Sequence, residues 1–128
     1  MKSISKDEVA AKLGSGQVVV VNVLAPPAYE KIHIKGSISI QKSELVNGRW
    51  RELDMSKEVV VHCSSYTCTA SREAADFLEA KGFKVRAYEG GIKEWAEAGL
   101  PMEGTIPPQR YLLEKYGNPA TLAPSTAD

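Results

Sequence analysis

Apolar residues along the chain form short runs that alternate with segments of helical spacing. Unbroken or nearly unbroken β-branched runs at Val18–Val23 and Val59–Val61 are typical of strands covered on both faces. Shorter apolar stretches at Ser37–Ile40 and Lys84–Tyr88 predict two further strands. The pattern therefore predicts a sheet whose central strands are buried.

Helices are expected between these strands. Ser5 and Glu8 form an S-x-x-E capping box that opens a short helix, which Gly14 and Gly16 stop. Apolar residues at helical spacing predict a helix over about Ala70–Lys81, ended by Gly82. Further helical segments are expected after Pro26, near Leu45 within a polar irregular stretch from Gln41 to Met55, through Ile92–Ala96 and over Arg110–Tyr116.

Length and order of elements together predict the fold class. With 128 residues the chain is long enough for one ordinary domain. Strands that alternate with helices predict a single α/β domain whose central, mostly parallel sheet has about five strands, with helices on both faces. We expect a domain over residues 1–103 and a C-terminal extension over 104–128, partly helical and disordered from Ala120. An apolar patch in the extension leaves open whether it docks on the domain or forms a homodimer.

Composition and charge narrow the function. The chain is 43% hydrophobic and 25% charged, and its 16 basic and 16 acidic residues are interspersed. Neither a basic footprint for nucleic acid nor a polybasic membrane patch stands out. The longest apolar run, Val18–Leu24, is far below the ~18 residues of a membrane span, and the N-terminus lacks a signal-peptide core. We expect a cytoplasmic protein without nucleic-acid or membrane partners.

Candidate chemistry begins at Cys63, directly after the third predicted strand. The carboxyl ends of strands in an open α/β sheet are where ligands bind. The loop of residues 64–69 (SSYTCT) then enters a helix, so its backbone N–H groups and the helix dipole can stabilise an anion. A thiolate at this position should have a lowered pKa and act as a nucleophile, and the same cradle would stabilise a persulfide.

Three sequence blocks resemble rhodanese domains. Residues 33–38 (HIKGSI) resemble the H-I-x-G-A-I signature of that family, and residues 59–63 (VVVHC) resemble its central strand and active-site cysteine. Residues 90–101 (GGIKEWAEAGLP) match its closing pattern, and the similarity covers about residues 4–103. The resemblance implies a sulfurtransferase in which Cys63 takes sulfane sulfur from a donor such as thiosulfate and passes it to a thiol or cyanide. It implies neither a cofactor nor a metal.

The loop departs from the family pattern at several positions. Cys68 stands where many single-domain members carry a cation for thiosulfate, and Tyr66 replaces a common glycine. Arg72 is the nearest basic residue, one turn into the helix, and residues 22–24 (NVL) replace the usual D-x-R. High activity on thiosulfate is therefore not expected.

Cys68 has two interpretations. It could attack a persulfide on Cys63 and leave a Cys63–Cys68 disulfide, or cycle with Cys63 as a redox sensor, provided the Cα atoms approach within ~7 Å. Alternatively it packs under the loop as a small apolar residue. Tyr66 is expected to act as a gate over Cys63.

Three other functions are compatible with a cysteine at this position. A cysteine phosphatase needs an arginine six residues after the cysteine, where this chain has Thr69. A metal site would need Cys63, Cys68, His62 and His33 to converge, and His62 should point away from Cys63. His33 and Trp95 are better explained as structural residues. A non-catalytic binding or redox-sensing module remains the alternative.

The sequence thus predicts the following site. The partners are a small sulfur-donor anion and a thiol acceptor, either a small molecule or a protein. Cys63 is the nucleophile and Cys68 the resolving thiol, and the substrate-binding residues are Ser64, Ser65, Tyr66, Thr67, Thr69 and Arg72.

Overall fold

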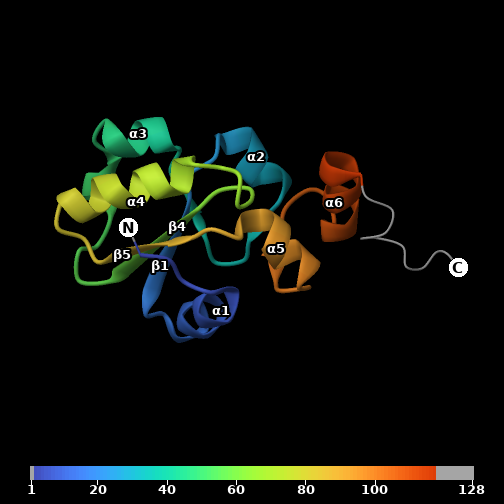
Figure 1. Ribbon diagram of the computed structural model, residues 1–128, viewed down its shortest axis with the longest axis horizontal. Helices are drawn as coiled ribbons and strands as arrows, with labels where there is room; N and C mark the ends of the chain where they lie inside the picture. Colours follow the sequence, from blue (N-terminus) through green and yellow to red (C-terminus); the bar gives the residue numbers. More distant parts are fainter. Residues whose placement is uncertain (1, 118–128) are drawn as a thin grey trace, which may run out of the picture.

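A parallel four-stranded sheet forms the middle layer of the protein in the computed structural model, which describes residues 2–117 (Figure 1). The strand order is β3-β1-β4-β5, and β1 pairs with β4 from Val18↔Glu58 to Asn22↔His62. The bounds are β1 Val18–Asn22, β3 Ile38–Ser39, β4 Glu58–His62 and β5 Val85–Tyr88.

Helices cover both faces of this sheet, because successive residues of its strands point to opposite sides. Val59 and Val61 of β4 face one core, under α3 and α4, whereas Val60 faces the other, under α1 and α5. Figure 1 shows these layers, with α3 and α4 above the sheet and α1 below it. The helices are α1 Lys6–Ser15, α2 Pro26–Lys31, α3 Lys42–Val46, the 3₁₀ helix η1 Arg49–Glu52, α4 Ala70–Ala80, α5 Gly91–Glu97 and α6 Pro108–Tyr116.

The predicted α/β architecture is confirmed, but the number of strands in the main sheet differs from the predicted five and a second small sheet is present. The main sheet has four strands, and a single parallel bridge from Ser3 to Ala87 extends its β5 edge. A separate antiparallel pair joins β2 (His33–Ile34) to β6 (Met102–Glu103). These two-residue strands are too short to show a periodic pattern, so the sequence could not predict them.

The first helix begins where the capping residues predict. The Ser5 Oγ accepts a hydrogen bond from the Glu8 backbone N–H at 3.2 Å, and Gly16 ends the helix in the left-handed conformation at φ 74°. Charged side chains then fasten this helix to the sheet. Arg86 on β5 binds both Glu8 and Glu58, with the shortest contact 2.6 Å from its Nε to the Glu58 Oε2.

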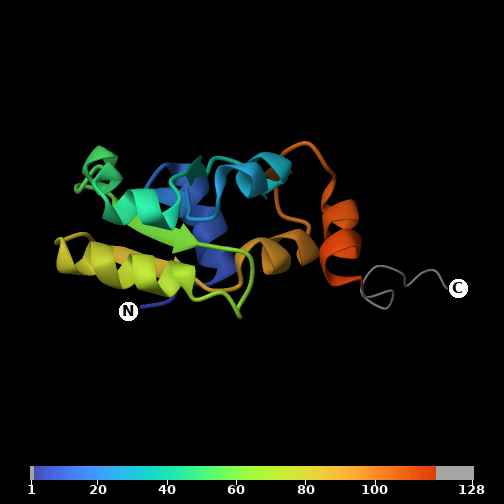
Figure 2. The same cartoon turned by 90° about the horizontal axis from the view of Figure 1, so that it is seen from above.

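The C-terminal helix α6 packs on α5 at one end of the molecule (Figures 1 and 2). Tyr111 and Leu112 are buried there, whereas Leu113 points outward and is 54% exposed. The predicted disorder from Ala120 concerns residues outside the described part of the chain. Within residues 2–117, no helix combines the length and apolar character that crossing a membrane requires.

Candidate functional site

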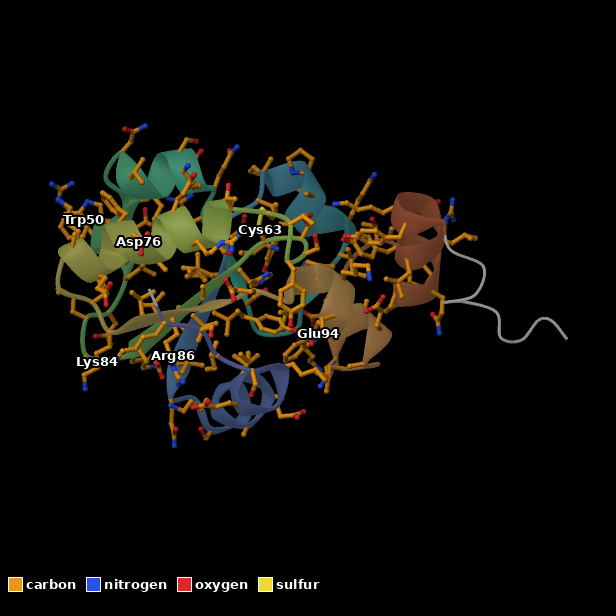
Figure 3. All side chains as sticks on the ribbon, viewed as in Figure 1. Trp50, Cys63, Asp76, Lys84, Arg86 and Glu94 are labelled. Carbon is orange, nitrogen blue, oxygen red and sulfur yellow. A yellow bond between two sulfur atoms is a disulfide. The ribbon has the colours of Figure 1, made fainter. Side chains whose placement is uncertain are left out.

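Cys63 lies immediately beyond β4, at the carboxyl edge of the sheet. The loop that follows it runs to Thr69 and enters α4 (Figure 3). The Cys63 side chain is 1% exposed and joins the core on the α3 and α4 side of the sheet. The predicted strand–loop–helix context of the cysteine is therefore present, with the sulfur inside the rim of the loop.

The start of the loop is fixed by the start of α5. The Cys63 carbonyl oxygen accepts a hydrogen bond from the Ile92 N–H at 3.1 Å, and the Ser64 carbonyl oxygen accepts one from the Lys93 N–H at 2.9 Å. Gly91 has φ 65°, and a Cβ placed there would lie 2.6 Å from the Cys63 carbonyl oxygen. Only glycine allows this approach, which explains why the G-G turn at 90–91 belongs to the site.

The loop curls so that its two cysteines meet. The Cys68 N–H donates to the Ser65 carbonyl oxygen at 3.1 Å, which closes a turn in the middle of the loop. Cys63 and Cys68 form a disulfide, with their Cα atoms 6.4 Å apart. This separation is within the range that a disulfide requires. Cys68 also packs against the core cluster that contains Cys63, so in this conformation it is both bonded to Cys63 and packed as an apolar residue.

Ser71 is a site residue that the sequence analysis missed. Its Oγ lies 3.7 Å from the Cys63 Sγ, and the residue is 2% exposed. In the dithiol state a hydroxyl at this position can donate a hydrogen bond to the Cys63 thiolate. Its position in the helix could have indicated this, since helical spacing places Ser71 on the same buried face of α4 as Ala75 and Leu78.

The remaining predicted binding residues lie along the rim of the loop. The hydroxyls of Ser65 and Thr67 are 3.0 Å apart and hydrogen-bond to each other. Tyr66 is 61% exposed, and its hydroxyl lies 3.4 Å from the Glu94 Oε2 on α5. The negative charge of Glu94 raises the pKa of the Tyr66 phenol. Ser64 is half-buried and Thr69 exposed, and Thr69 precedes α4 without capping it through its side chain.

Arg72 is in the first turn of α4, and its side chain pairs with a carboxylate. Its Nη1 lies 3.5 Å from the Glu89 Oε2, directly after β5. The Arg72 guanidinium therefore binds a carboxylate on the neighbouring strand end and not a side chain of the loop at 63–69. Glu89 was not among the predicted site residues.

His62 points to the face of the sheet opposite Cys63, as predicted. It is fully buried, and its Nδ1 lies 3.1 Å from the Cys63 carbonyl oxygen while its Nε2 has no partner. Burial lowers the pKa of His62 to about 4, so the ring is neutral at physiological pH. Because a carbonyl oxygen only accepts, the neutral ring donates from Nδ1.

Among residues 2–117, no three His, Cys, Asp or Glu side chains are arranged to hold a metal ion. His33 is structural, as expected. Its Nδ1 lies 2.7 Å from the Tyr29 carbonyl oxygen, and its ring stacks on that of Tyr29. Trp95 belongs to the core, with its Nε1 donating to the Pro101 carbonyl oxygen at 2.9 Å.

Comparison with known proteins places this geometry in a family. The model of the rhodanese-like domain matches residues 5–98. The HTH-type transcriptional regulator Rv0324 of Mycobacterium tuberculosis is 30% identical over 105 residues, which are 82% of this chain but 46% of that protein. The chain thus spans less than half the length of that relative.

Two further relatives match over most of both chains. The thiosulfate sulfurtransferase GlpE of Pseudomonas syringae is 34% identical over 89 residues, covering 69% of this chain and 81% of that protein. The crystal structure of the BH2092 protein from Bacillus halodurans superposes with a TM-score of 0.76 at 25% identity, covering 81% of this chain and 77% of the other. The chain therefore belongs to the rhodanese-like domain family.

Proposed function

We propose that the protein is a cysteine-dependent sulfurtransferase that carries sulfane sulfur on Cys63. The observation that carries the proposal is the position of Cys63, at the start of a strand–loop–helix turn that brings Cys68 to a Cα distance of 6.4 Å. Family membership supports the reaction class. We assign the reaction to the cytoplasm, where cysteines are kept available as thiols.

The first half-reaction forms a persulfide. The Cys63 thiolate attacks the outer sulfur of a sulfane donor, a new S–S bond forms and the bond within the donor breaks. With thiosulfate the products are the Cys63 persulfide anion and sulfite, and total charge is conserved. Ser71 and the loop N–H groups stabilise the negative charge on sulfur, because hydrogen bonds to an anion favour the charged form.

The second half-reaction returns Cys63 to the thiolate. An acceptor thiol takes the outer sulfur and becomes a persulfide itself, or cyanide takes it and becomes thiocyanate. Cys68 offers an internal route. The persulfide first takes a proton from water on its outer sulfur. The Cys68 thiolate then attacks the Cys63 Sγ, the outer sulfur leaves with this proton as hydrosulfide, and the Cys63–Cys68 disulfide remains until a thiol reductant opens it.

Intact-mass measurement of persulfide formation tests the proposal. The reduced protein, incubated with thiosulfate or a polysulfide, should gain one sulfur atom. Cys63→Ser should abolish the gain, and Cys68→Ser should lengthen the lifetime of the persulfide about tenfold or more, because the internal leaving reaction is removed. Absence of sulfur uptake from either donor would overturn the enzymatic function.

The second candidate function is a redox-sensing or binding module on the same scaffold, and the Cys63–Cys68 disulfide is the observation that favours it. A sensor of this kind forms the disulfide with an oxidant and needs no sulfur donor. Mass loss of two hydrogen atoms with peroxide, without sulfur uptake from any donor, would favour this function over transfer.

A further inference from the structure

The cysteine loop itself is uncharged, and an ion pair lies beside it. Residues 64–69 carry no charged side chain, so any charged side chain near Cys63 must come from a neighbouring element. Arg72 in the first turn of α4 supplies a guanidinium, but Glu89 lies 3.5 Å from its Nη1. Both side chains are partly exposed, at 39% and 27%, so an anion in the solvent can reach this pair.

A second carboxylate stands on the same side of the loop. Tyr66, Glu89 and Glu94 line one cavity of about 280 Å³. Glu94 accepts a hydrogen bond from the buried Tyr88 hydroxyl at 2.8 Å and lies 3.4 Å from the Tyr66 hydroxyl, so it is held at the rim. Figure 3 shows Glu94 on α5, at the end of the sheet where the Cys63 loop emerges.

Two further charged residues, Lys6 at the cavity and Glu73 on α4, have partners of opposite charge. Lys6 lines the cavity, but its Nζ lies 4.0 Å from the Asp7 carboxylate. Glu73, one residue beyond Arg72, is paired with Lys42. Two carboxylates, at Glu89 and Glu94, therefore oppose one guanidinium beside the loop. A dianion that approaches this rim is repelled more strongly than a monoanion.

We propose that Glu89 determines donor specificity by engaging Arg72, so that Cys63 takes sulfur from monoanionic donors, such as a persulfide carried on a thiol, in preference to dianionic thiosulfate. The inference rests on the proposed sulfurtransferase function. Glu89 acts through Arg72 and does not touch the donor, so it is a positioning residue. Its removal would free the guanidinium to meet an anion at the loop.

Two donors that differ by one charge make the test direct. Thiosulfate gives its outer sulfur to the Cys63 thiolate and leaves as sulfite. Methanethiosulfonate, a monoanion, gives its outer sulfur in the same way and leaves as methanesulfinate. Rates of thiocyanate formation with cyanide as acceptor report both reactions. The quantity compared between variants is kcat/KM for thiosulfate divided by kcat/KM for methanethiosulfonate. The intrinsic reactivity of the two donors is the same in every variant and therefore cancels in this comparison.

Glu89→Gln should shift that ratio toward thiosulfate by about 5- to 20-fold at low ionic strength, and the shift should shrink in concentrated salt. Arg72→Gln should shift it in the opposite direction, since Glu89 is then unpaired. The double variant should return to within about threefold of the unmodified protein, because the two charge changes cancel.

Glu114→Gln is the matched control. It makes the same change in net charge and also frees an arginine, since Glu114 Oε2 lies 2.7 Å from the Arg110 Nε in an exposed pair on helix α6. The ratio should stay within about twofold in this variant, as expected for a charge screened by solvent. An unchanged ratio in Glu89→Gln, with both donors active, would overturn the inference alone. Inactivity with both donors in every variant would overturn the sulfurtransferase function and the inference with it.

Discussion

At the scale of single residues, the burial of His62 makes the free energy of unfolding depend on pH. The ring is fully buried beside the Cys63 carbonyl oxygen, and burial lowers its pKa to about 4. In the unfolded chain a histidine takes up a proton near pH 6.5. As the pH falls from 7 to 5, this histidine therefore becomes protonated in the unfolded state but stays neutral in the folded state, and unfolding becomes more favourable.

We expect the free energy of unfolding to fall by about 2 kcal/mol between pH 7 and pH 5 from this residue alone. Urea denaturation at both pH values measures it. His62→Gln should flatten the dependence in that range. An equal dependence on pH in His62→Gln and in the unmodified protein would contradict the assignment.

At the residue scale, the sequence marks positions that are defined by short-range spacing. Cys63 is marked by its position after an apolar strand, and Cys68 by its spacing along the loop. Ser71 and Glu89 were missed because their roles depend on which side chains α4 and β5 bring to the loop. Neither a serine in a helix nor a glutamate after a strand carries that information by itself.

The contact between the Cys63 loop and the start of α5 belongs to the scale of elements. Gly91 and Gly99 both have a positive φ, at 65° and 71°, so alanine costs backbone strain of about 1 kcal/mol at either position. They differ in their surroundings. A Cβ at Gly91 would lie 2.6 Å from the Cys63 carbonyl oxygen, whereas nothing lies within 4 Å of one at Gly99.

Gly91→Ala should therefore lower the free energy of unfolding by about 3 kcal/mol and slow persulfide formation at Cys63 about tenfold, because the loop must move. Gly99→Ala should cost about 1 kcal/mol and leave that rate unchanged. Chemical denaturation and single-turnover intact mass give the two readouts. Equal effects of the two variants would show that backbone strain, and not contact with the loop, governs the site.

At the scale of the whole molecule, helix α6 decides how far the folded unit extends beyond the matched family region. Leu112 is buried against the α5 side of the core, while its neighbour Leu113 is 54% exposed. We expect Leu112→Ala to cost about 2–3 kcal/mol of stability and Leu113→Ala less than about 0.5 kcal/mol. Thermal denaturation compares them. A large loss in Leu113→Ala instead would indicate that this face is covered by a partner.

The sequence by itself determined the alternation of strands and helices, the parallel sheet and the position of Cys63 at its carboxyl edge. These follow from apolar periodicity, capping residues and short-range spacing, which act within a few residues of the chain. Tertiary structure decided the rest. The Arg72–Glu89 pair, the Ser71 contact with Cys63 and the packing of α6 join residues whose proximity exists only once the sheet is assembled. Charge and hydrogen bonding around Cys63 are therefore properties of the fold, whereas the cysteine and the composition of its loop are properties of the sequence.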